Sequence, residues 1–125
     1  MSCYVYCLYS TEDGEPRYVG QTNDKVSYRF KQHIVAALDH TPGQLYDWMR
    51  DVWRRDFDVS VYTLQEFIIP KDLDMFEQYW IGQFANLLNV FGKKPAILDS
   101  PVAKEIKAAL KTQVQLARKP IGRPR

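Results

Sequence analysis

Residues 3–22 read CYVYCLYSTEDGEPRYVGQT, and this segment carries a strong β-hairpin signal. Aromatic and branched side chains, which favour strands, fill its first part from Cys3 to Ser10. Thr11 to Pro16 is rich in turn-forming residues, and a second strand-like run follows from Arg17 to Gln21. We therefore predict a β-hairpin with Asp13-Gly14 at its tip.

The rest of the chain shows four helical patterns and one further strand-like pattern. Apolar residues at the spacing of one helix face mark the helices, whereas the alternation of Val59, Val61 and Thr63 marks the strand. The predicted elements are helices over about 25–39, after Thr41-Pro42, from near Pro70 to about Ala85 and from about Val102 to Leu116, and a strand over 58–67. This order predicts an α/β fold in which helices flank a small three-stranded, partly antiparallel sheet.

Charge divides the chain at Gly92. The 125 residues carry a formal net charge of +2 from 17 Lys and Arg and 15 Asp and Glu. Residues 1–92 hold eight basic and thirteen acidic side chains, a net of −5, whereas residues 93–125 hold nine and two, a net of +7. We therefore predict a folded domain over 1–92, followed over 93–125 by a basic helix and a disordered tail or linker suited to a polyanion. A solvated basic helix that serves only solubility is the alternative.

Length and composition exclude several protein classes. A chain of 125 residues with 46% hydrophobic side chains can bury a core without disulfides or a structural metal. No apolar run approaches the ~20 residues that cross a bilayer, so we expect no membrane partner and a cytoplasmic location. Cys3 and Cys7 are about 13 Å apart on an extended strand, beyond disulfide reach. We expect buried, unreactive thiols, and a cysteine nucleophile acting with His33 is the less supported alternative.

The helix predicted after Pro70 carries a carboxylate on its apolar face. Counted at about 100° per residue, Glu77 falls between Phe84 and Ile81 in the apolar stripe. A carboxylate in this position is costly unless it pairs with a cation, binds a metal or is protonated. Glu77 is therefore a candidate metal ligand or catalytic group, with a position at the edge of the stripe or an arginine pair as the alternative.

Basic and phenolic side chains supply further candidates. Arg29 and His33 are four residues apart, so they lie on one face of the first predicted helix. Arginine presents a fork suited to phosphate and histidine titrates near neutral pH, although an ordinary surface pair has the same spacing. Tyr4, Tyr6 and Tyr18 lie on the two hairpin strands, where core filling with hydroxyls at the rim is the alternative to a functional role.

Taken in chain order, these residues resemble the GIY-YIG nuclease domain over about residues 3–92. Tyr4-Val5-Tyr6 stands at the first triplet and Tyr18-Val19-Gly20 at the second, followed by Arg29-x-x-x-His33, Glu77 and Asn89. Tyr4 and Val5 depart from the Gly and Ile of the first triplet, but both motif tyrosines remain. Gln21 stands where some members carry lysine. Asn86 competes for the asparagine position, although the spacing favours Asn89, which would orient Glu77 or the last turn of the site.

The resemblance implies a DNA endonuclease, a phosphodiesterase of the kind found in homing endonucleases and phages. It implies that Glu77 holds one Mg²⁺ or Mn²⁺ ion and that Arg29 stabilises the charge on the phosphate. Either Tyr6 or Tyr18 would accept the proton of the attacking water, with His33 assisting. A non-catalytic DNA- or protein-binding module on the same scaffold is the alternative.

The basic C-terminal segment is the expected DNA contact. The residues expected to bind DNA are Lys111, Arg118, Lys119, Arg123 and Arg125. Gly122-Arg123-Pro124 is similar to the short arms that some DNA-binding proteins lay along an A·T-rich minor groove, with a plain disordered terminus as the alternative. GIY-YIG domains commonly serve as catalytic heads tethered to separate recognition modules. The resemblance thus allows an additional C-terminal DNA-recognition domain in a longer chain, or a stand-alone nuclease.

Overall fold

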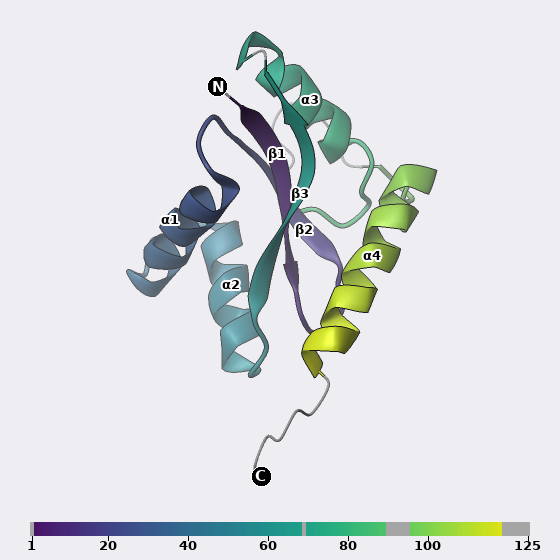
Figure 1. Ribbon diagram of the computed structural model, residues 1–125. Helices are drawn as coiled ribbons and strands as arrows, with labels where there is room; N and C mark the ends of the chain where they lie inside the picture. Colours follow the sequence, from purple (N-terminus) through teal and green to yellow (C-terminus); the bar gives the residue numbers. More distant parts are fainter. Residues whose placement is uncertain (1, 69, 90–95, 119–125) are drawn as a thin grey trace.

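A three-stranded antiparallel sheet lies at the centre of the computed structural model, which describes residues 2–68, 70–89 and 96–118 (Figure 1). The middle strand is β1 (Cys3–Ser10), which pairs with β2 (Pro16–Thr22) on one side and β3 (Val59–Phe67) on the other. Gly14, at the tip of the β1–β2 hairpin, has a φ of 67°, a conformation that favours glycine. The predicted α/β class and three-stranded sheet are confirmed, and both strand pairs are antiparallel.

Helices cover both faces of this sheet (Figure 1). The helices are α1 (Val26–Leu38), α2 (Gln44–Arg54), the short 3₁₀ helix η1 (Pro70–Asp72), α3 (Leu73–Ile81) and α4 (Pro101–Arg118). Alternation along β1 divides the core into two clusters. Val5 and Cys7 pack with residues of α3 and α4, whereas Tyr6 and Leu8 pack with residues of α1 and α2.

The end of α3 differs from the sequence prediction. The apolar pattern extended this helix to about Ala85, but it ends at Ile81 with Gly82 as its C-cap residue. The Ala85 N–H donates to Asp99 Oδ1 over 3.0 Å, so the segment that precedes α4 holds this turn in place. Phe84 is nevertheless 1% exposed. The apolar pattern therefore identified the buried residues correctly, but a partner far away in sequence determines the backbone.

The basic helix α4 packs into the core beside α3. Ala103, Leu110 and Val114 are buried in the same cluster as Trp80 and Phe84. None of the helices in the described part of the chain is long and apolar enough to cross a membrane. Whether residues 93–125 also act as a separate unit stays a prediction.

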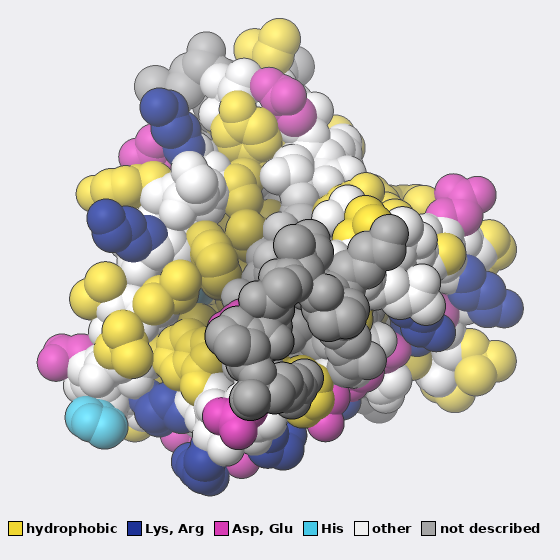
Figure 2. All heavy atoms as spheres, turned by 60° about the horizontal axis from the view of Figure 1, so that its bottom comes forward, with side chains coloured by type: hydrophobic (Ala, Val, Ile, Leu, Met, Phe, Trp, Pro, Cys, Tyr) yellow, Lys and Arg dark blue, Asp and Glu magenta, His cyan; other side chains and the backbone are white. Residues whose placement is uncertain are grey.

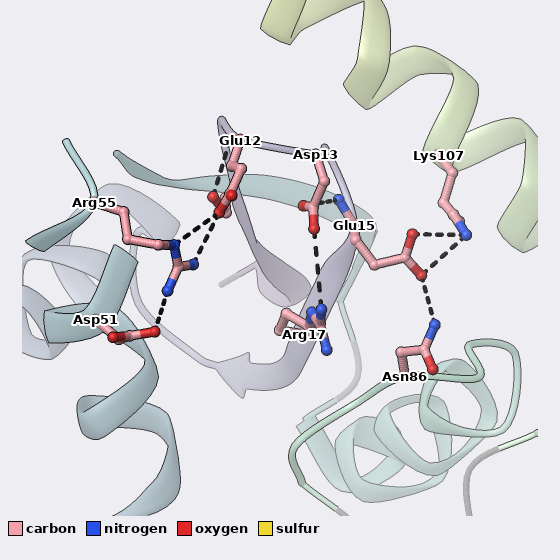
Figure 3. Close-up of polar contacts among 9 residues, drawn as sticks. Glu12, Asp13, Glu15, Arg17, Asp51, Arg55, Asn86 and Lys107 are labelled. Carbon is pink, nitrogen blue, oxygen red and sulfur yellow. Dashed lines mark hydrogen bonds and ion pairs between the residues drawn. The ribbon is translucent and has the colours of Figure 1, made fainter. Parts of the chain in front are cut away.

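Ion pairs connect α4 to the hairpin turn (Figure 3). Lys107 Nζ lies 2.8 Å from Glu15 Oε2 and 2.6 Å from Asp99 Oδ2, and these three side chains are 18%, 17% and 13% exposed, respectively. Burial favours the neutral carboxyl of Asp99, but the hydrogen bonds from Lys107 and the Ala85 N–H, together with nearby lysine charges, outweigh burial and lower the pKa. On the other side of the turn, Arg55 Nη2 lies 2.9 Å from Glu12 Oε1. The acidic side chains of the hairpin turn thus form ion pairs with neighbouring basic side chains within the protein.

Candidate active site

Tyr6 and His33 form a buried pair between β1 and α1. The Tyr6 hydroxyl lies 2.8 Å from His33 Nε2, and both side chains are 1% exposed. Burial, assisted by the positive charge of Arg29, lowers the pKa of His33 to about 4. Burial also raises the pKa of Tyr6. At neutral pH the pair is therefore a protonated phenol against a neutral imidazole that holds one N–H and one lone pair.

Gly20 makes room for this phenol. It pairs with Tyr6 across the hairpin, and a Cβ at position 20 would lie 2.5 Å from Tyr6 Oη and 2.6 Å from Tyr6 Cζ. It would also lie 2.9 Å from Cε2 of Tyr18. All three distances are too short for a normal contact. In the sequence Gly20 stands out only as the last residue of the second triplet, although a glycine inside a strand is itself a signal of a close approach.

Tyr18 and Arg29 adjoin the buried pair. The Tyr18 ring centroid lies 5.5 Å from that of His33 and 6.5 Å from that of Tyr6. Tyr18 is half-buried, unlike Tyr6, so it is the more accessible of the two phenols. Burial raises the pKa of both phenols, and the nearby charge of Arg29 opposes this rise. Arg29, near the start of α1, also donates from Nη1 to Gln32 Oε1 over 3.0 Å.

Glu77 reaches the same site from α3. Burial raises the pKa of this half-buried carboxyl, a hydrogen bond from Gln21 lowers it, and the charge of Asp74 raises it. The negative charge of Glu77 in turn raises the pKa of Tyr6 and Tyr18. Within the described ranges, neither Glu77 nor Arg29 forms an ion pair with a side chain of opposite charge. The site therefore contains a carboxylate and a guanidinium that no described side chain of opposite charge neutralises.

The oxygen donors fit a water-rich divalent cation better than a closed metal cage. Asp74 stands one helical turn before Glu77 and accepts a hydrogen bond from Gln21 Nε2 at 2.5 Å. Among the described residues, no group of three or more His, Cys, Asp or Glu side chains could hold a metal ion. Mg²⁺ typically keeps several waters and binds through one or two carboxylates together with substrate phosphate. Glu77, with Asp74 nearby, meets this requirement.

Asn89 holds the strand that carries Tyr18. Its Oδ1 accepts from the Val19 N–H over 3.1 Å, and its Nδ2 donates to the Val19 carbonyl over 2.6 Å. The neighbouring Leu88 N–H donates to the Arg17 carbonyl over 2.6 Å. The family resemblance implies that Asn89 orients Glu77 or the last turn of the site. These bonds instead place Asn89 against the outer edge of β2, where it fixes the backbone next to Tyr18.

Tyr46 is a neighbour of the site that sequence reasoning did not single out. Its hydroxyl lies 3.5 Å from His33 Nδ1, and the two ring centroids are 6.1 Å apart. Tyr46 is the third residue of α2, and it is not part of the apolar stripe that identifies this helix in the sequence. Nothing in the local sequence around Pro42-Gly43 indicates that the side chain of Tyr46 contacts α1.

The expected DNA-binding residues lie mostly beyond the described structure. Lys119, Arg123 and Arg125 are outside the described residues, Arg118 is the last residue of α4, and Lys111 is exposed on that helix. Figure 2 shows Lys and Arg side chains scattered among Asp and Glu side chains, without one basic patch on the face in view. The DNA-binding surface of the C-terminal segment stays a prediction.

Comparison with known proteins agrees with this arrangement. The family model of the GIY-YIG catalytic domain matches residues 2–89. The chain belongs to the GIY-YIG family. GIY-YIG domains are endonucleases that generally use divalent metal ions, so the family implies nuclease activity on DNA in general terms.

A viral protein is similar to this GIY-YIG chain. It is the MSV199 domain-containing protein 146R of Invertebrate iridescent virus 6, 27% identical over 90 residues that make up 72% of this chain and 36% of the viral protein. The chain thus spans about a third of the length of that relative. No solved structure matches the chain.

Proposed function

We propose that the chain is a metal-dependent endonuclease that hydrolyses DNA phosphodiester bonds. The observation that supports this proposal is the meeting of Tyr6, Tyr18, Arg29, His33 and Glu77 in one site, drawn from β1, β2, α1 and α3. The guanidinium and the carboxylate both lack a partner of opposite charge among the described side chains. A phosphodiester and a divalent cation supply the two missing charges.

In this proposal, Arg29 binds the phosphate and Glu77 holds the cation, either Mg²⁺ or Mn²⁺. The arginine fork donates two parallel hydrogen bonds to phosphate oxygens and stabilises the charge that grows on them during attack. When bound, the cation supplies Lewis-acid polarisation of the phosphate and stabilises the leaving oxygen. Gln21 orients Glu77 through its side-chain amide.

Tyr18 is the better placed of the two phenols to accept the proton of the attacking water. Tyr6 is enclosed and its hydroxyl is bonded to His33, whereas Tyr18 is half-buried and adjoins a cavity. Both phenols are protonated while Glu77 keeps its charge, because burial and that charge raise their pKa. With its charge neutralised by a bound cation, Glu77 would no longer raise the pKa of Tyr18, while Arg29 would continue to lower it. The pKa of Tyr18 would then move toward the range of a general base. Tyr6 and His33 position the ring of Tyr18.

Replacing Glu77 tests the proposal. Glu77→Gln keeps the size of the side chain and removes the charge, so metal-dependent nicking of supercoiled plasmid should fall at least ~100-fold. Glu66→Gln is the matched control, because Glu66 is an exposed glutamate on β3 and its replacement should leave nicking unchanged. Urea unfolding of both variants checks that they are folded. Nicking by Glu77→Gln at the rate of the control would rule out this role for Glu77.

The same assay separates the enzyme from a non-catalytic binding module. The wild-type chain is mixed with supercoiled, branched and single-stranded DNA in Mg²⁺ and in Mn²⁺, and cut sites are mapped. Binding without cleavage of any substrate in either metal would favour the module.

We further propose that longer versions of this protein carry an additional C-terminal DNA-recognition domain, in line with the greater length of the viral relative.

A further inference from the structure

The cavity that adjoins Tyr18 has a volume of about 290 Å³, and the proposed hydrolysis assigns no substrate group to it. Among the described residues, its wall consists of Tyr18 from β2, the segment from Gly43 to Tyr46 at the start of α2, and Leu88 with Asn89. Three separate parts of the chain therefore build it. The volume is just below the ~300–1,000 Å³ that ligand pockets span, so it suits one flat ring system and is too small for a folded segment of another protein.

The lining of this cavity suits a flat, uncharged, hydrogen-bonding group. Tyr18 and Tyr46 contribute aromatic rings, and Leu45 and Leu88 contribute aliphatic surface. The exposed side-chain amide of Gln44 adds two N–H donors and a carbonyl acceptor to the lining. None of the described lining residues is charged, so the wall itself does not select for a phosphate or a carboxylate. A nucleobase combines an extended π face with polar edges and matches these walls.

The position of the cavity indicates where such a base would come from. Tyr18 belongs both to the cavity wall and to the candidate active site, where its ring lies 5.5 Å from that of His33. The charges of Arg29 and Glu77 both act on the Tyr18 hydroxyl. A strand whose phosphate lies between Arg29 and Glu77 would therefore bring one of the two flanking nucleotides to the cavity.

We propose that this cavity binds one unpaired base of the substrate strand, next to the phosphate that is cut. The inference rests on the proposed nuclease function and names its substrate class. Extruding a base from a duplex costs at least as much as one stacked base returns, so a base that is already unpaired is preferred. The preferred substrate is thus single-stranded, bulged or branched DNA with an unpaired nucleotide beside the cut.

An abasic scan of the substrate tests the cavity. A single-stranded oligonucleotide with a mapped cut site is prepared with an abasic nucleotide at each position around the cut. With the wild-type chain, one flanking position should lower kcat/KM by roughly 5- to 150-fold, the range for loss of one base stacked on an aromatic side chain. Tyr46→Ala should reduce this abasic effect to less than about twofold. Tyr46→Phe should retain it, because the variant keeps the ring and removes only the hydroxyl that faces His33.

A binding measurement distinguishes failure of the cavity from failure of the nuclease. Fluorescence anisotropy of labelled oligonucleotides in EDTA gives Kd without cleavage, and the same coupling between the abasic position and Tyr46→Ala should appear there. Cleavage that is indifferent to every abasic position would overturn the base cavity while the nuclease stands. Coupling in Kd without any cleavage would support the cavity and refute the nuclease. An abasic effect that persists in Tyr46→Ala would place the base elsewhere and overturn the inference.

Discussion

Gly20→Ala is a small change that should disturb the candidate site strongly. The added methyl would lie 2.5 Å from Tyr6 Oη and 2.6 Å from Tyr6 Cζ, about 1 Å inside a normal carbon contact. Tyr6 is 1% exposed, so its ring has no solvent to move into. Relief requires the phenol to shift, and a shift breaks its 2.8 Å contact with His33 Nε2.

The magnitude follows from these two effects. Overpacking of a well-packed core by a methyl group costs about 1–3 kcal/mol. A buried hydroxyl or imidazole nitrogen left without its partner adds about 1–3 kcal/mol. We therefore expect the free energy of unfolding to fall by about 2–6 kcal/mol. The methyl also crowds Tyr18 Cε2 at 2.9 Å, and Tyr6 positions the Tyr18 ring. Cleavage should therefore fall about 100-fold, because a misplacement of about 1 Å has effects of that size.

Urea unfolding and plasmid nicking measure the two consequences separately. The stability readout does not depend on the proposed function. Tyr6→Ala removes the two shortest contacts and leaves only the 2.9 Å approach to the half-buried ring of Tyr18, so adding Gly20→Ala in that background should cost less than in the wild-type chain and reveal the coupling in a double-mutant cycle. If Gly20→Ala unfolds at the wild-type urea concentration, the close approach of Tyr6 to Gly20 does not exist, and the steric account of this glycine is refuted.

Three further predictions concern other parts of the chain. Lys107→Met removes the cation that pairs with the mostly buried carboxylates of Glu15 and Asp99 and should lower the free energy of unfolding by about 1–3 kcal/mol in urea. The control Lys31→Met, at an exposed position of α1, should change it by less than about 0.5 kcal/mol, and equal effects would contradict the network. Because the pKa of His33 falls from 6.5 to about 4 on folding, the unfolded chain binds more protons between these values, and stability should decline as pH falls through this window by up to about 1.4 kcal/mol per unit. A His33→Gln variant should lack this contribution, and an identical pH profile would count against a buried neutral imidazole. Replacing the three basic residues of 119–125 by Gln should lower the slope of log Kd against log salt by about 0.9 for each phosphate that the tail no longer neutralises, and an unchanged slope would exclude the tail from DNA binding.

Local sequence signals predicted the elements and missed what distant segments impose. The hairpin was predictable because alternating strand residues on both sides of TEDGEP leave few other conformations, and Gly14 occupies the required turn position. The end of α3 was not predictable, because the turn after Ile81 depends on a bond from Ala85 to Asp99. Apolar periodicity indicates which side chains are buried, but it does not indicate which distant segment will contact the end of a helix.

The candidate site shows the same division. Helical periodicity singled out Glu77, and the motif order in the sequence supplied Tyr6, Tyr18 and Arg29. The structure brings these side chains together. The role of Gly20 depends on its distance to a phenol on the neighbouring strand, and that of Tyr46 depends on the packing of α2 against α1. Neither contact can be predicted from the local sequence. For α4, the net charge after Gly92 predicts a role for the basic residues. The apolar residues Ala103, Leu110 and Val114 of the same helix instead determine how it packs into the core.

The bonds from residues 88 and 89 to β2 also affect how the protein behaves at high concentration. β2 is an edge strand, and the outward N–H and carbonyl of Val19 and the carbonyl of Arg17 would otherwise be open to a strand from another molecule. The Asn89 amide occupies both groups of Val19, as a neighbouring strand would. Removal of this amide would therefore expose a template for intermolecular β-pairing, and the first sign in Asn89→Ala should be light scattering that grows with protein concentration.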